Sequence, residues 1–87
     1  MNNSFLRTAW QVLERWPESG LARVHLGFVL KTAFDDDVNG AVHLAAGIAS
    51  GDAGVVDGRF YLQLGDALQR LGRPHEAQQV LDRCHTL

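Results

Sequence analysis

Two similar stretches decide the fold of this chain of 87 residues: Leu26-Gly27-Phe28-Val29-Leu30 and, later, Leu64-Gly65-Asp66-Ala67-Leu68. Each has a leucine directly before its glycine and another leucine three residues after it. The glycines at 27 and 65 lie 38 positions apart. A glycine inside a helix costs about 1 kcal/mol relative to alanine. Because the chain accepts this cost at two equivalent places, we infer close helix contacts at both glycines and a repeated structural unit.

The apolar residues have helical spacing almost throughout the chain, which predicts an all-α fold. The expected helices span residues 3–16, 21–34, 38 or 40 to 50, 57–71 and 75–86. We expect Asn3 or Ser4 to cap the first helix, Pro17 to end it, and Asp57 to cap the fourth. The segment 51–54, Gly-Asp-Ala-Gly, is predicted to be a loop. No run of alternating polarity exceeds four residues, so no strand is predicted.

Composition and charge argue against several classes of protein. Eight Lys and Arg stand against ten Asp and Glu, without a basic stripe, so we expect no nucleic-acid partner. No segment approaches the roughly 18 apolar residues of a membrane span, and the first residues lack the features of a secretory signal. We therefore expect no membrane partner and favour a cytoplasmic location, or a fragment of a longer protein. The single cysteine, Cys84, leaves the compartment otherwise unknown.

The pairs of helices resemble the tetratricopeptide repeat, a unit of about 34 residues that forms two antiparallel helices. Small loop insertions, including two residues in the 35–39 turn, account for the longer spacing. The resemblance implies a right-handed α-solenoid of about two and a half repeats in one domain, 1–87: a half repeat at 3–16, then repeats at 20–55 and 57–87. Gly27 with Ala41, and Gly65 with Ala77, are expected to let paired helices approach. The expected packing residues are Gly27, Leu30, Ala41, Ala45, Ile48, Tyr61, Leu64, Gly65, Leu68, Ala77, Leu81 and Cys84.

A narrower resemblance rests on the segments 24–31, VHLGFVLK, and 50–70, SGDAGVVDGRFYLQLGDALQR. Together they look like the tetratricopeptide region before the catalytic domain of aspartyl/asparaginyl β-hydroxylases. The resemblance covers residues 17–72, roughly two thirds of the chain. It implies a relation to an iron- and 2-oxoglutarate-dependent dioxygenase that hydroxylates Asp or Asn in epidermal-growth-factor-like domains. In that family the repeat region helps to form the substrate groove.

The dioxygenase chemistry itself is not expected in this chain. Its iron needs histidine ligands, often with a carboxylate, and open coordination positions. The sequence has His25, His43, His75 and His85 but no His-x-Asp motif and no β-rich segment for a catalytic barrel. We therefore expect no catalytic residue, no metal and no cofactor. Three interpretations stay open: a peptide- or protein-interaction module, the substrate-binding lobe of a hydroxylase with its catalytic domain outside the chain, or a generic scaffold or adaptor.

Stacked repeats line their inner face with the first helix of each pair, which predicts a peptide-binding groove. Lys31, Arg59 and Arg70 are expected to receive an acidic peptide through charge-assisted hydrogen bonds. The alternative is that Asp66 and Arg70, four residues apart on one helix, pair with each other. The candidate groove residues are Phe28, Lys31, Arg59, Gln63, Asp66 and Arg70, with Val24 and Leu62 on the same surface.

Two acidic or metal-like patterns have plainer interpretations. Residues 35–40 match the start of a calcium-binding loop, but Ala46 stands where a bidentate glutamate is needed. We favour an acidic turn in which Asp37 or Asn39 caps the next helix. The four histidines lack metal-ligand spacing and are interpreted as scattered residues. Cys84 is expected to be a small buried packing residue.

Apolar residues near both ends of the array are predicted to be uncovered. Phe5, Leu6 and Trp10 lie in the first helix, and Val80 and Leu81 lie in the last. Repeat arrays are stabilised by contacts between neighbouring units, so open ends expose apolar surface. We therefore expect a marginal monomer, a homodimer through the open ends, or a partner such as a dioxygenase domain.

Overall fold

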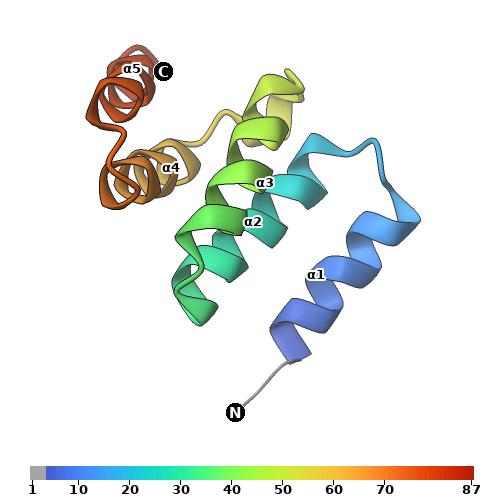
Figure 1. Ribbon diagram of the computed structural model, residues 1–87. Helices are drawn as coiled ribbons and strands as arrows, with labels where there is room; N and C mark the ends of the chain where they lie inside the picture. Colours follow the sequence, from blue (N-terminus) through green and yellow to red (C-terminus); the bar gives the residue numbers. More distant parts are fainter. Residues whose placement is uncertain (1–3) are drawn as a thin grey trace.

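The computed structural model of the chain describes residues 4–87, and within this part it is all-helical, without a strand (Figure 1). The predicted all-α class is thus confirmed. The side chains of residues 1–5 lie outside the described part, and so do the expected cap at Asn3 or Ser4 and the expected exposure of Phe5. The elements are α1 (Ser4–Arg15), α2 (Gly20–Phe34), α3 (Asp37–Ala49), the 3-10 helix η1 (Ala53–Val55), α4 (Gly58–Arg70) and α5 (Pro74–Cys84).

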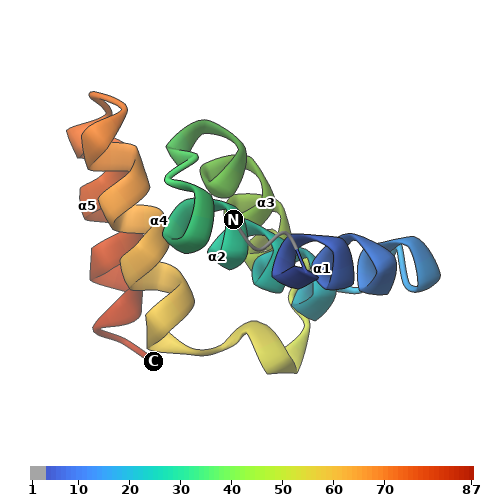
Figure 2. The same cartoon turned by 90° about the horizontal axis from the view of Figure 1, so that it is seen from below.

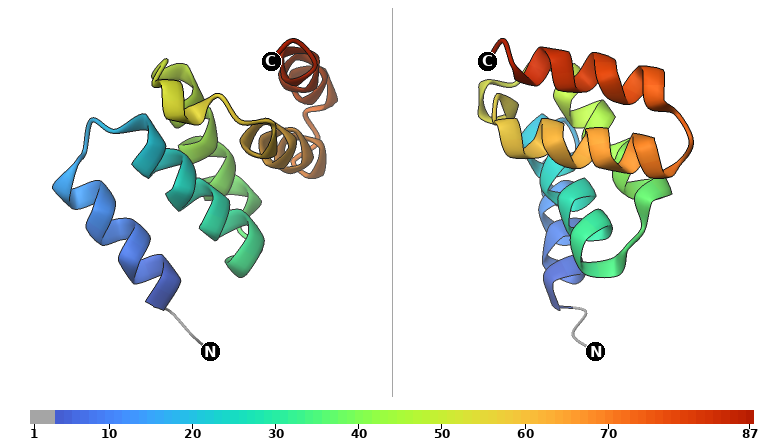
Figure 3. Two further views of the ribbon diagram at one scale, coloured as in Figure 1. Left: turned by 180° about the vertical axis from the view of Figure 1, so that it is seen from behind. Right: turned by 90° about the vertical axis from the view of Figure 1, so that its left-hand side faces the viewer.

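The helices form two antiparallel pairs, α2 with α3 and α4 with α5, while α1 lies beside α2 (Figures 1 and 2). The molecule is flat, with extents of 32 × 29 × 15 Å. In Figure 1, α4 and α5 are seen nearly end-on, whereas α1, α2 and α3 run across the view. The right-hand view of Figure 3 shows the same crossing from the side. The second pair therefore crosses the first instead of continuing in its direction, and α4 contacts both α2 and α3.

Glycines line the contact between α2 and α3. A Cβ atom on Gly27 would lie 2.7 Å from the amide nitrogen of Leu44 and 2.8 Å from the carbonyl oxygen of Gly40. A Cβ atom on Gly47 would lie 2.7 Å from the carbonyl oxygen of Gly20. The backbones of α2 and α3 therefore touch at two places, which are about two helical turns apart. The predicted contact at Gly27 is confirmed, but its partners are Gly40 and Leu44, not Ala41 as expected.

The contact between α4 and α5 is built differently. A Cβ atom on Gly65 would lie 2.8 Å from Cδ2 of Leu81, so this glycine faces a side chain and not a backbone. Leu81, rather than the expected Ala77, is its nearest neighbour, while Ala77 is fully buried in the main core. Both repeated glycines thus lie where the helices of a pair meet, but their surroundings differ. At Gly65 the Leu81 side chain lies between α4 and α5, whereas at Gly27 the backbones of α2 and α3 are in contact.

Two apolar clusters make the core. The smaller one joins α1 to α2 and consists of Ala9, Leu13, Ala22, Leu26 and Leu30. The larger one joins the two pairs and consists of Val24, Ala41, Leu44, Ile48, Val55, Phe60, Tyr61, Leu64, Ala67, Leu68 and Ala77. The expected packing residues are therefore buried, with three exceptions: Ala45 is exposed, and Leu81 and Cys84 are only partly buried.

Side-chain caps fix the starts of α2, α3 and α4. Asp57 Oδ1 accepts a hydrogen bond from the Arg59 amide at 2.9 Å, which confirms the predicted cap of α4. At α3 the cap is Asp36, which accepts from the Asn39 amide at 3.0 Å, so the expectation of Asp37 or Asn39 was wrong. Gly40 lies inside α3 and not in a turn. Residues 35–40 therefore form a capped helix start, and the geometry of a calcium-binding loop is not present.

The connection between the pairs, residues 50–57, is more ordered than the predicted loop. It contains η1, and Val55 of η1 is buried in the main core. Asp52 Oδ2 accepts a hydrogen bond from the Gly20 amide at 2.6 Å, so the connection is also attached to the start of α2. A single 3-10 turn has no periodic pattern long enough to be recognised in the sequence.

Candidate functional site

The expected groove residues lie where α4 crosses α2, but two of the residues expected at this surface, Val24 and Lys31, are buried. Arg59, Asp66 and Arg70 are exposed on α4, and Phe28 on α2 is half-buried. Val24 is fully buried in the main core, so its expected place on the groove surface was wrong. Leu62 and Gln63 are accessible on α4, Leu62 more than half so.

Lys31 joins three helices. Its side chain, only 6% exposed, places Nζ 2.7 Å from Asp66 Oδ2 on α4 and 2.9 Å from Asp37 Oδ1 on α3. The Asp37 contact is an ion pair rather than a well-aligned hydrogen bond. Burial by itself lowers the pKa of Lys31, but its contacts with the carboxylates of Asp66 and Asp37 together raise it. Lys31 is therefore a link between helices and not a free cation.

Asp66 has a second cationic partner on its own helix. Arg70 Nε donates to Asp66 Oδ2 at 2.9 Å, which confirms the alternative that these two residues pair. The hydrogen bonds from Lys31 and then from Arg70 lower the pKa of Asp66. The arrangement leaves Arg70 at the surface with part of its guanidinium group accessible.

Arg59 and Asp57 form a second pair at the start of α4. Arg59 Nη2 lies 2.8 Å from Asp57 Oδ2, and Nε also donates to the same carboxylate at 3.2 Å. The hydrogen bonds from the Arg59 side chain and backbone lower the pKa of Asp57 to about 2. The Arg59 side chain is still 79% exposed, so a ligand can reach it.

An aromatic hollow of about 90 Å³, lined by His25, Phe28, Arg59 and Phe60, opens where α2 meets the first turn of α4. The Phe60 ring meets the His25 ring edge-on at 5.5 Å and the Phe28 ring edge-on at 6.2 Å. Phe60 itself is buried in the main core. The hollow therefore has a fixed floor. Phe28 and Arg59 were expected to bind a ligand, whereas the contributions of His25 and Phe60 were missed.

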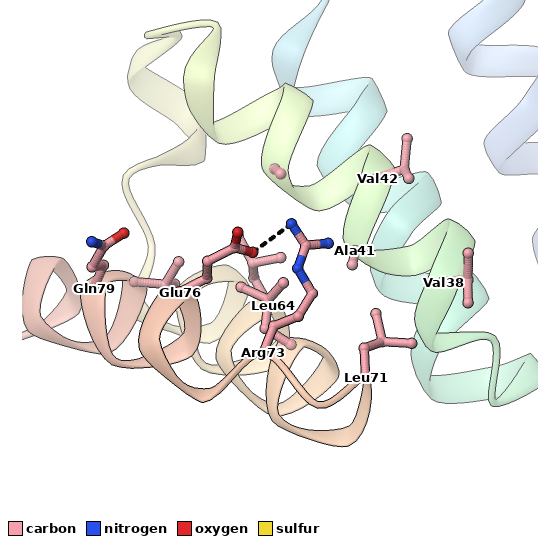
Figure 4. A pocket seen from close by; sticks show the side chains of 11 residues that line it. Val38, Ala41, Val42, Leu64, Leu71, Arg73, Glu76 and Gln79 are labelled. Atoms are coloured by element: carbon pink, nitrogen blue, oxygen red, sulfur yellow. Dashed lines mark ion pairs between the residues drawn. The ribbon is translucent and has the colours of Figure 1, made fainter.

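A larger apolar pocket of about 420 Å³ lies between α3 and the second pair of helices (Figure 4). Two of its lining residues, Arg73 and Glu76, form an ion pair with each other. The sequence analysis missed this pocket, although the spacing of Val38, Val42 and Ala45 along an uncharged face of α3 was a usable signal. The lining residues are Val38, Ala41, Val42, Ala45, Leu64, Leu68, Leu71, Arg73, Glu76, Gln79 and Val80.

His25 and His43 each lie against a different aromatic ring, Phe60 and Trp10 respectively. His43 meets the ring of Trp10 edge-on at 5.8 Å, and its Nδ1 lies 3.5 Å from Nη1 of Arg23. Burial, and then the charge of Arg23, lower the pKa of His43. Within residues 4–87 no three His, Cys, Asp or Glu side chains gather as metal ligands would. Cys84 is half-buried against the main core, with Sγ 3.8 Å from the carbonyl oxygen of Gly58.

The expectation of uncovered apolar residues at the open ends is met only in part. Trp10 is 42% exposed, whereas Leu6, Val80 and Leu81 are partly buried. Trp16 on the first connection and Val42 on α3 are more exposed than Trp10. Of the helices in the described part, none combines the length and the apolar character that crossing a membrane demands.

The fold and surface describe an all-helical array of paired helices with a mixed aromatic and charged face. No protein-family model matches the chain. The curated proteins similar to it include the aspartyl/asparaginyl beta-hydroxylase of Mus musculus, 44% identical over 72 residues, and that of Homo sapiens, 45% identical over 71 residues. Each match covers 82% of this chain but 9% of the relative. The chain is thus related to these hydroxylases over a short local region, as its resemblance implied.

Proposed function

We propose that this chain is a tetratricopeptide-like interaction module, non-catalytic on its own, that binds an extended peptide along the face formed by α2 and α4. The observation that carries the proposal is that the first helices of the two pairs contact each other and place Phe28, Arg59 and Arg70 at an accessible junction. The 38-residue recurrence of helix-contact glycines supports the repeat assignment. Because the pair α4 and α5 crosses the pair α2 and α3, the array of two repeats is bent and not straight.

Arg59 and Arg70 are the cations that we propose for peptide recognition. Both are more than half exposed, and each is already directed by one carboxylate, Asp57 or Asp66. A directed guanidinium group loses little freedom when it binds a second carboxylate, which favours acidic peptides. Lys31 contributes indirectly, because it holds Asp66 in place beneath Arg70.

We also propose that the module serves a hydroxylase as its substrate-binding lobe, with the catalytic domain outside this chain. The relation to aspartyl/asparaginyl beta-hydroxylases supports this, and the chain spans only 9% of those relatives. Iron requires clustered histidine and carboxylate ligands, and such donors are scattered over residues 4–87. The residues present therefore do not fit an iron site. A generic scaffold or adaptor is the alternative.

Peptide display on the immobilised chain tests the binding function. Selected peptides should bind the chain in solution and lose most of their affinity when Arg59 and Arg70 are both replaced by alanine. Thermal melts of the double variant check that it folds. Selected peptides that bind the double variant unchanged would remove the α2–α4 face from consideration. Sequencing the gene on both sides of this coding region separates a hydroxylase lobe from an independent adaptor.

We further propose a second copy of the chain as a partner at the open end of the array near α1, because Trp10 and Trp16 keep much of their apolar surface exposed. Apolar side chains at the end of a repeat array lack the cover that a neighbouring unit gives elsewhere. Sedimentation velocity over a hundredfold dilution should show a dimer that dissociates. A single monomer species at every concentration, together with a cooperative melt, contradicts self-association.

A further inference from the structure

The hollow formed by His25, Phe28, Arg59 and Phe60 has the size and chemistry of a subsite for one peptide side chain. Its volume of about 90 Å³ is well below the roughly 300–1,000 Å³ of pockets that hold small molecules or cofactors. It is therefore too small for a cofactor, but it has room for one branched aliphatic side chain. Apolar anchors in fixed pockets supply much of the affinity of many interfaces.

The floor of the hollow is held in place before any ligand arrives. Phe60 is buried in the main core and meets both His25 and Phe28 edge-on, with interplanar angles of 87° in each case. Aromatic rings fixed in this way lose little freedom on binding. His25 and Phe28 come from α2, and Phe60 comes from α4, so the hollow exists only while the two pairs keep their crossing.

The rim of the hollow favours an anion beside the apolar side chain. Arg59 is its charged lining residue, and Asp57 binds that guanidinium group through Nε and Nη2. Within the described part of the chain, Nη1 makes no hydrogen bond, so it can donate to a ligand. The hollow also lies at the N-terminal end of α4, where the helix dipole favours negative charge. Asp57 reduces this preference but leaves Arg59 directed and accessible.

We propose that this hollow is the anchor subsite for a peptide in which a leucine-sized apolar residue stands next to a carboxylate residue. The apolar side chain packs against Phe28 and Phe60, and the carboxylate accepts a hydrogen bond from Arg59. This inference rests on the proposed peptide-binding function and adds the specificity to it. It places the anchor at the first turn of α4 and not at the larger pocket of Figure 4.

The test uses the 87-residue chain labelled with ¹⁵N and three short probes followed by NMR. The first probe is acetyl-Gly-Leu-Asp-Gly-amide; the second has Ala in place of Leu, and the third has Asn in place of Asp. We expect the first probe to shift the amide signals of residues 25–28 and 58–61. Each change of probe should weaken binding about tenfold, because it removes an anchor or a charged hydrogen bond.

Two arginine variants complete the test. Arg59→Gln should abolish the difference between the Asp and Asn probes. Arg73→Gln is the matched control, because Arg73 is also paired with a nearby carboxylate but lies at the other pocket. It should bind all three probes as the unchanged chain does. The same loss in both variants would overturn the inference.

The outcomes separate the subsite from the general binding function. If peptides selected by display bind the α2–α4 face while the three probes bind equally, or shift other residues, the anchor subsite is wrong and the proposed function stands. If neither the selected peptides nor the probes bind, both are wrong. Ordered affinities with shifts confined to the two named segments support the subsite.

Discussion

Replacing Lys31 by methionine tests how the two helix pairs are joined. Methionine keeps an unbranched apolar stem in the buried position but removes the charge that binds Asp37 and Asp66. Loss of one partner from a fully buried ion pair costs about 3–5 kcal/mol. Asp66 is 47% exposed and keeps Arg70, so its share is that of a surface pair, about 0–1 kcal/mol. Asp37 is 18% exposed and carries the larger share. We expect a total loss of about 2 kcal/mol.

Urea unfolding followed by circular dichroism measures this loss. With an m-value of about 1 kcal/mol/M for a chain of this size, the midpoint should fall by about 2 M. Asp66→Asn should cost about 0.5–1 kcal/mol, because this carboxylate is half exposed. The double variant Lys31→Met with Asp37→Asn should recover at least half of the loss, since no partly buried charge is left unpaired.

Two results would refute the reasoning about Lys31. A loss below about 0.5 kcal/mol in Lys31→Met would show that the link contributes no more than a surface pair. A double variant whose loss equals the sum of the losses measured for Lys31→Met alone and for Asp37→Asn alone would show that Lys31 and Asp37 are not coupled. The selected peptides should also bind Lys31→Met more weakly, because Asp66 loses its fixed position beneath Arg70.

Three further perturbations follow from the contacts. Gly27→Ala should destabilise the chain by about 3 kcal/mol, because the added Cβ meets backbone atoms. Gly65→Ala should cost less than about 1 kcal/mol, because its Cβ meets the movable side chain of Leu81. Equal losses of stability in thermal melts of the two variants would contradict this difference. The lowered pKa of Asp57 adds stability that is present above about pH 4 and is lost as the pH falls toward 2; Asp57→Asn should flatten this part of the stability profile, and an unchanged profile refutes the assignment. The lowered pKa of His43 means that the unfolded chain binds its proton more readily, so stability should fall as the pH drops below about 6.5. His43→Gln should reduce that slope in melts between pH 7.5 and 5.5; an identical slope is the contrary result.

Local features of the chain were predictable from the sequence because they depend on neighbours along one helix. Helical spacing predicted each of the five helices to within a few residues. The cap at Asp57 and the pair of Asp66 with Arg70 follow from separations of two and four residues. The recurrence of Gly27 and Gly65 placed both at a contact between helices.

Contacts between helices were harder to predict, because the spacing of apolar residues does not encode a crossing angle. The partners of Gly27 were missed for this reason, although Gly40 and Gly47, seven residues apart on α3, matched Gly20 and Gly27 on α2. The three-helix link at Lys31 depends on how α4 crosses the first pair. So does the pocket in Figure 4, since its walls come from three helices.

The hydrogen bond from the Gly20 amide to Asp52 closes the first unit on itself, since it joins the start of α2 to a residue beyond the end of α3. A shortened version of this unit that stopped at Ser50 would lose that acceptor and also the buried Val55. The natural cut for an isolated helix pair is therefore after residue 57, and any graft of the unit into another protein must carry the connecting segment along with both helices.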